Sequence, residues 1–239
     1  MYTLSSISNR IRTPKQQDLL ELLAGYLLVL AALWSPRPWA YIFFISGLFW
    51  VASISLSSGA NRRELGLSLS GAKRVYWIVA AAAAFAVLAA FLALRCGTLH
   101  PPFSTTTPGL HAWGYLVWAF VQQFILQDYF LARLLRVLPS KKAAVLAAAA
   151  LFASAHIPNP ILTVATFIWG VVACALFLRF RNLYSLGVAH AILGLCIAFS
   201  IPAGIHHQMH VGLGYLRYHA DTAKTSRSLH HGGPEHTKS

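Results

Sequence analysis

Polar side chains with the chemistry of a catalytic or metal site occur inside the hydrophobic segments of this sequence. They are Gln122, Gln123, Gln127, His156 and His190. A polar group at that depth costs roughly several kcal/mol unless it is paired or reaches water, so such residues are functional candidates. Gln123 and Gln127 are four residues apart and share one face of a helix, with Gln122 beside them. The cluster predicts one buried site, although hydrogen bonding between helices is the usual role of a single membrane glutamine.

The order of these residues resembles the motifs of the CPBP family of intramembrane metalloproteases, which includes the CAAX prenyl endopeptidases and the bacteriocin-immunity (Abi) proteins. The family motifs are Glu-Glu-x-x-x-Arg, Phe-x-x-x-His and His-x-x-x-Asn. Their counterparts are Gln122–Gln127, Phe152–His156 and His190–Gly194, and the resemblance covers Trp113–Ile201. It implies a metalloendopeptidase that hydrolyses membrane-embedded or lipidated peptides. It also implies catalytic positions at Gln122, Gln123, Gln127, His156 and His190, and a divalent metal such as zinc at His156, His190 and Gln123.

The sequence departs from those motifs at the positions that carry charge. Glutamine stands at 122 and 123 where the family has glutamates, and a neutral amide cannot accept a proton as a general base. Gln127 replaces an arginine and Gly194 an asparagine. Loss of the acids together with the arginine is a matched change, because that arginine alone would be a buried unpaired charge. The site is therefore predicted to be neutral and its proteolysis weak or absent. A non-catalytic protein that binds a partner peptide is the alternative.

One acid, Asp128, lies deep in a hydrophobic segment. It follows Gln123 by five residues, about 140° around the helix, so it could act as the base only if the helix bulges or the motif register differs. We expect it instead to pair with Arg133 or Arg136. Asp18 and Glu21, at the start of the first hydrophobic segment, are predicted to be interfacial.

Two further functions use the same intramembrane residues. A membrane electron carrier could hold haem between His156 and His190, and an absorbance spectrum would separate this hypothesis from the others. A transporter would need a helix broken at the midplane, for which Pro158–Pro160 is the candidate. At 1.5 Å per residue His190 lies about 10 Å into its helix and His156 about 20 Å into its own. The two histidines can meet only if the helix that carries His156 starts below the membrane surface or tilts strongly.

The composition sets the elements that position these residues. Of 239 residues, 57% are hydrophobic and 10% charged, whereas soluble domains have about 25% charged residues. Apolar runs of about 20 residues can span a bilayer as helices. The sequence thus predicts an all-α, polytopic membrane bundle of about seven transmembrane helices: Leu19–Trp34, Trp39–Leu56, Val75–Leu94, Trp113–Val137, Ala143–Ile157, Ile161–Leu178 and Leu183–Ile201.

Positive charge dominates, with 19 Lys and Arg against 6 Asp and Glu. Most of these cations lie in alternate gaps between the hydrophobic runs, which predicts that the N-terminus and those gaps are cytoplasmic. Nucleic acid is therefore not the expected partner, and the lipid bilayer is. The short loops favour a bacterial inner membrane.

The chain divides into three predicted regions. Residues 1–112 are N-terminal membrane helices and loops, and 113–202 form the CAAX-protease-like core. Residues 203–239 are a basic, His-rich tail that we predict to be disordered. His206, His207 and His210 lie within this tail and could bind zinc or copper, so their role is left open.

Overall fold

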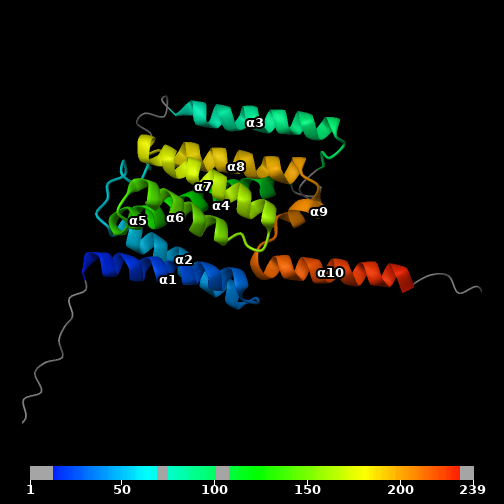
Figure 1. The fold of residues 1–239 in the computed structure, drawn as a ribbon, viewed down its shortest axis with the longest axis horizontal. Helices are drawn as coiled ribbons and strands as arrows, with labels where there is room; N and C mark the ends of the chain where they lie inside the picture. Colours follow the sequence, from blue (N-terminus) through cyan, green and yellow to red (C-terminus); the bar gives the residue numbers. More distant parts are fainter. Residues whose placement is uncertain (1–12, 69–74, 101–107, 232–239) are drawn as a thin grey trace, which may run out of the picture.

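The computed structural model describes residues 13–68, 75–100 and 108–231, and every regular element in these ranges is helical (Figure 1). The all-α prediction is confirmed. The elements are α1 (Pro14–Trp34), α2 (Trp39–Leu56), α3 (Tyr76–Arg95), α4 (Pro108–Phe124), the π-helix η2 (Ile125–Leu131), α5 (Ala132–Val137), α6 (Lys141–Ser154), α7 (Pro160–Phe180), α8 (Leu183–Ser200), α9 (Ala203–His206), the 3-10 turn η3 (His207–Met209) and α10 (Gly212–His231).

Five of the described helices are long and apolar enough to cross a membrane: α1, α2, α3, α7 and α8. They correspond to five of the seven predicted spans. The segment predicted over 113–137 is divided into α4, η2 and α5. The segment predicted over 143–157 contains α6, which has 14 residues and ends before His156. The predicted total of seven spans is therefore not confirmed.

Polar caps explain why helices separated by very short connections begin where they do. Ser140 accepts a hydrogen bond from the backbone of α6, Asn159 from that of α7 and Asn182 from that of α8. Such caps satisfy backbone N–H groups that the first helical turn leaves without partners. Pro160 follows its cap at the first helical position, where proline is favoured.

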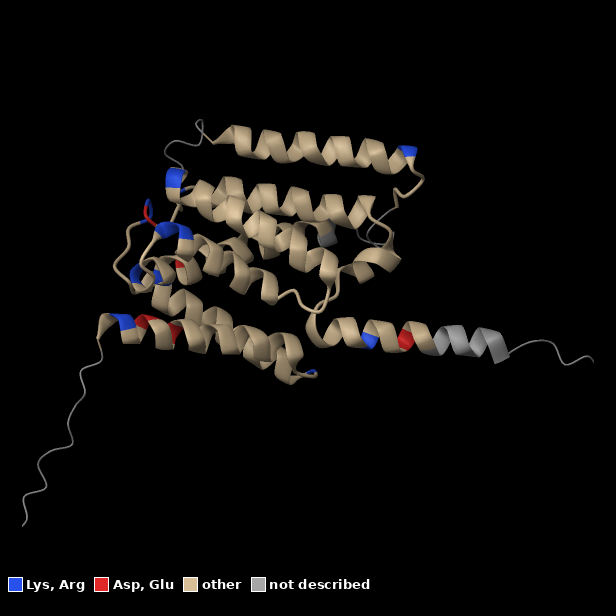
Figure 2. Cartoon of the chain, viewed as in Figure 1, with Lys and Arg blue, Asp and Glu red and all other residues tan. Residues whose placement is uncertain are grey.

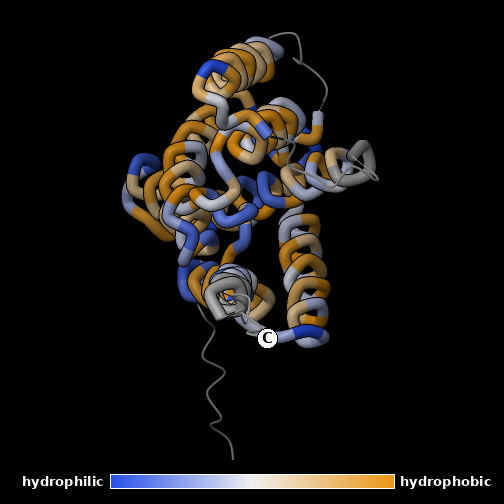
Figure 3. Tube along the Cα trace, turned by 90° about the vertical axis from the view of Figure 1, so that its right-hand side faces the viewer, coloured by the Kyte–Doolittle hydropathy of each residue, from blue (hydrophilic) through white to orange (hydrophobic). Residues whose placement is uncertain are grey.

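Helix α8 lies at the centre of the packing, in contact with α3, α4 and α7. Its Gly187 lets α4 approach closely, because a Cβ there would come within 2.7 Å of the Phe120 ring. The outer helices instead expose large apolar side chains, including Phe49 at 75% and Val87 at 71% of their surface. Figure 3 accordingly shows hydrophobic residues, in orange, along the helices on the outside of the bundle. This is the surface expected of a protein surrounded by lipid.

Lysine and arginine gather at one end of the bundle (Figure 2). This charged end carries the start of α1 and the turns that join α5 to α6 and α7 to α8. The opposite end carries Arg37 in the turn after α1, Arg95 at the end of α3 and Arg217 on α10. The asymmetry follows the pattern from which the orientation was predicted.

The prediction of a disordered tail is wrong for residues 203–231, which form α9, η3 and α10; residues 232–239 lie outside the described ranges. The start of α10 is fixed to the bundle by backbone contacts. Gly212 donates to the carbonyl of Ile157 and adopts a positive φ of 53°. A Cβ at this glycine would lie 2.5 Å from the carbonyl oxygen of Leu33. From that point α10 extends beyond the bundle (Figure 1).

Candidate functional site

The structure joins three of the five predicted site residues in one buried hydrogen-bond network. Gln127 on η2 donates through Nε2 to Oε1 of Gln123 on α4, at 3.2 Å. Gln123 in turn donates through Nε2 to Nδ1 of His190 on α8, also at 3.2 Å. Both glutamines are almost completely buried, and His190 is buried too. We call this the polar cluster.

His156 lies beside the polar cluster, in the turn that follows α6. Its Nδ1 donates to the carbonyl oxygen of Phe152 at 2.8 Å. The Phe152 ring packs edge-on against both imidazoles, with centroid distances of 5.0 Å to His156 and 5.8 Å to His190. The two histidines therefore share one neighbourhood in spite of the difference in depth calculated from the sequence.

Unpaired polar atoms remain around the polar cluster. The Gln127 oxygen Oε1 is buried and has no hydrogen-bond partner, and neither has the buried indole Nε1 of Trp169. The Trp169 ring lies 6.1 Å from His190, centroid to centroid. A buried unpaired donor and acceptor are unusual in folded proteins. Sequence reasoning missed Trp169, because a tryptophan in an apolar helix carries no signal that separates it from lipid-facing residues.

Two motif positions, Gln122 and Gly194, lie outside the polar cluster. Gln122 is partly exposed and makes no side-chain hydrogen bond within the described residues. Gly194, one turn after His190, packs against Tyr115 so closely that an added Cβ would lie 1.8 Å from the Tyr115 hydroxyl. A phenol oxygen thus fills the position from which a longer side chain at 194 would project.

As they lie, these residues do not fit a metal ion. The described residues contain no group of three or more His, Cys, Asp or Glu side chains arranged to hold one. His190 accepts a hydrogen bond through Nδ1, so in its neutral form its proton is on Nε2, which leaves neither nitrogen free to ligate. The oxygen of Gln123 is engaged by Gln127. The donor atoms of Gln123, Gln127 and His190 thus bind one another.

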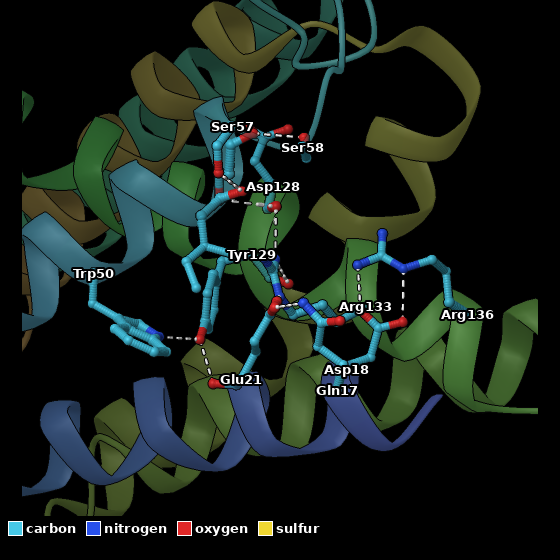
Figure 4. Close-up of polar contacts among 12 residues, drawn as sticks. Gln17, Asp18, Glu21, Trp50, Ser57, Ser58, Asp128, Tyr129, Arg133 and Arg136 are labelled. Carbon is cyan, nitrogen blue, oxygen red and sulfur yellow. Dashed lines mark hydrogen bonds and ion pairs between the residues drawn. The ribbon is translucent and has the colours of Figure 1, made fainter. Parts of the chain in front are cut away.

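The expected pairing of Asp128 with Arg133 or Arg136 is wrong, because both arginines bind acids of α1 (Figure 4). Arg133 binds the Glu21 carboxylate, with Nε at 2.8 Å from Oε2, and Arg136 makes a two-pronged pair with Asp18. Asp18 and Glu21 do lie at the start of the first span, but they are anchors for α5. Their sequence separation from the arginines, more than 100 residues, hid this pairing.

The helix does bulge at Asp128, since η2 is π-helical over Ile125–Leu131. The bulge does not bring Asp128 into the polar cluster. The carbonyl of Asp128 accepts a hydrogen bond from Ser55, at the end of α2, and its buried Oδ2 has no partner. A catalytic role for Asp128 was predicted to require a bulged helix, and the helix is bulged there. The Asp128 carboxylate nevertheless makes no hydrogen bond to any residue of the polar cluster.

The three histidines of the tail do not converge on one site. His206 stacks on His100 with centroids 5.8 Å apart, whereas His207 contacts His219 of α10 at 4.6 Å. His210 packs against Tyr218 at 5.5 Å. His206 thus contacts a different aromatic ring from the other two, whereas His207 and His210 both lie beside Tyr218.

Comparison with known proteins finds a family that the middle of the chain resembles. Residues 104–196 match the family model described as type II CAAX prenyl endopeptidase Rce1-like. The matched residues include all three motif segments, so the resemblance predicted from the sequence is confirmed. No curated protein and no solved structure matches the chain. The protein is thus a helical membrane protein that is similar to the CAAX proteases over these residues.

Proposed function

We propose that this protein binds a membrane-embedded or lipidated peptide at the polar cluster and hydrolyses it slowly or not at all. The observation that carries the proposal is the neutrality of the cluster. Gln123 and Gln127 fill the space beside His190 with amides, and no carboxylate joins their network within the described residues. A hydrolase of this type needs a group that takes a proton from water, and the amides cannot do so.

Binding without efficient hydrolysis is supported by the unpaired atoms. Trp169 offers a buried N–H and Gln127 a buried carbonyl oxygen. A peptide backbone carries the complementary C=O and N–H groups, and hydrogen bonds with these groups would remove the cost of leaving both atoms unpaired. The charged end of the bundle, which carries most cations, is the end that we place in the cytoplasm. A bacterial inner membrane suits the short loops.

The catalytic half of the proposal is tested by restoring charge. The triple variant Gln122→Glu, Gln123→Glu and Gln127→Arg supplies a proton acceptor and its counter-ion. General-base assistance is worth about 10²–10⁴-fold, so this variant should cleave a fluorogenic lipidated peptide faster than the native protein. Adding His156→Ala should abolish the gain. If the native protein cleaves at an ordinary rate and only Asp128→Asn stops it, Asp128 is the base and the proposal is wrong.

The binding half is tested with the same peptide carrying a photocrosslinker. Trp169→Phe keeps a ring against His190 and removes the unpaired N–H, so crosslinking should fall several-fold, as loss of one hydrogen bond of about 1 kcal/mol requires. Trp77→Phe is the matched control, because Trp77 is exposed on α3, where its ring packs on Phe180. Equal crosslinking by both variants would contradict a role of the cluster in binding.

A further inference from the structure

A cavity of about 800 Å³ lies at the end of the bundle opposite the charged end. One wall is the end of α1 and the turn into α2, and the other is the first part of α10. Two guanidinium side chains line it, Arg37 from the turn and Arg217 from α10. It is remote from the polar cluster in the sequence, and none of the cluster residues lines it.

Neither arginine is neutralised by an acid within the described residues. Arg37 lies over the ring of Tyr41, 5.4 Å from its centroid, and makes no ion pair. Arg217 makes no ion pair either. Asp221 also lines the cavity but already has an interaction of its own. Two cations facing one cavity repel each other unless an anion lies between them.

The cavity is placed where lipid headgroups would lie. Trp34 and Trp39 are exposed at the ends of α1 and α2, and tryptophan gathers at the membrane interface. Below this level the two helices expose Leu27, Ile42 and Ile45. Apolar side chains also line the cavity itself, among them Leu33, Val211 and Leu213. A lipid held there would meet cations at its headgroup and apolar surface along its tails.

We propose that Arg37 and Arg217 bind the phosphate of an anionic phospholipid. The planar guanidinium matches phosphate oxygens with paired, charge-assisted hydrogen bonds. The apolar lining and the adjacent lipid-facing helices favour a lipid over free phosphate. Arg37 lies in the turn between α1 and α2, and Arg217 lies on α10. A headgroup bound to both arginines would therefore join α10 to the bundle.

The proposal is tested by titrating the purified protein in zwitterionic nanodiscs with phosphatidylglycerol and counting bound lipid by native mass spectrometry. The double variant Arg37→Gln, Arg217→Gln should bind phosphatidylglycerol about tenfold or more weakly, because it loses charge-assisted hydrogen bonds, which are roughly twice as strong as neutral ones. Arg95→Gln is the matched control. Arg95 lies at the same end of the bundle, stacks over Phe91 at 5.2 Å and does not line the cavity.

Three outcomes would overturn it. Equal loss in the Arg95 control would mean that overall charge, and not the cavity, attracts the lipid. Displacement of the lipid by excess inorganic phosphate would make this a free-phosphate site. Unchanged binding in a double variant that elutes as a folded monodisperse protein would remove the arginines from lipid recognition.

Discussion

Acidic side chains of α1 neutralise the two arginines of α5, and the clearest example is Glu21, whose partner Arg133 is buried. The Arg133 side chain is 3% exposed and pairs with Glu21, which is 15% exposed. The Arg133 guanidinium also stacks on the Tyr129 ring at 4.0 Å, and the Tyr129 hydroxyl donates to the Glu21 carbonyl. Removing one member of a buried pair leaves the other charge without compensation. Glu21 is therefore a structural residue that ties α1 to α5.

Glu21→Gln should lower the free energy of unfolding by about 2–4 kcal/mol, because Arg133 would remain charged and buried. Steric-trap unfolding in bicelles measures this change. Glu64→Gln is the control, since Glu64 is exposed and accepts a hydrogen bond from the Asn61 backbone at 2.9 Å. A loss of stability no larger than in the control would show that the pair contributes nothing.

The close packing of α4 against α8 can be tested at Gly194. Gly194→Ala would place a methyl group against the Tyr115 hydroxyl, and overpacking of this kind costs about 1–3 kcal/mol. Gly114→Ala on α4 is the matched control, because a Cβ there meets nothing within 4 Å. The thermal unfolding midpoint should fall only in the first variant, and Tyr115→Phe should recover part of the loss. Equal midpoints would contradict the close contact of α4 with α8.

At the scale of elements, the attachment of α10 should depend on pH through His207. Partial burial and, second, the neighbouring His219 lower the pKa of His207 below its ordinary 6.5. Burial, together with His100 and His207, lowers the pKa of His206 as well. Between its lowered pKa and about 6.5, His207 binds fewer protons when α10 is docked than when it is released. Docking is thus favoured above pH about 6.5 and weakens as the pH falls.

Amide hydrogen exchange of residues 212–218 measures this release. Exchange should accelerate as the pH is lowered through that range, after correction for intrinsic rates. His207→Phe keeps a ring against Tyr215, 4.8 Å away in the native protein, but cannot be charged, so its pH dependence should be flatter. The groups facing His207 are Tyr215, Tyr218 and His219. The same pH dependence in the Phe variant would assign the effect to another group.

Elements with strong apolar composition could be predicted from the sequence, and elements set by distant contacts could not. Hydropathy located α1, α2, α3, α7 and α8 to within a few residues. The π-helix η2 has no distinctive composition and lies where α2, α6 and α7 all pack. The helix α10 was missed because its residues are polar, and only its anchoring at Gly212 reveals how it joins the bundle.

Some site residues could likewise be predicted from the sequence, and others depend on distant contacts. The motif order and the i, i+4 spacing predicted that Gln123 and Gln127 share a face, and they form a hydrogen bond in the structure. His190 was predicted to belong to the same buried site, but its direct hydrogen bond to Gln123 could not be predicted, because that bond depends on how α4 packs against α8. Trp169 and Tyr115 could not be predicted at all, because their position depends on how α7 and α4 turn toward α8.

For the whole molecule, the distribution of charge predicts its orientation in the membrane. Lys141 and Lys142 start α6 at the charged end, together with Arg179 and Arg181 at the far end of α7. A reporter enzyme active only in the cytoplasm should be active when fused after Lys142, and one fused after Arg95 should be inactive. Activity in the reverse order would place the charged end outside, against the usual preference of positive residues.

The shortness of α6 has a consequence for the surrounding lipid. Its 14 residues extend about 21 Å, whereas the hydrocarbon of a bilayer is about 30 Å thick. Leu146 on this helix is 51% exposed, so lipid tails beside α6 would meet an apolar surface shorter than the hydrocarbon layer. Such hydrophobic mismatch is relieved by local thinning of the bilayer. The membrane should therefore be thinnest beside the turn that carries His156, where a lipidated peptide would cross the least hydrocarbon on its way to the polar cluster.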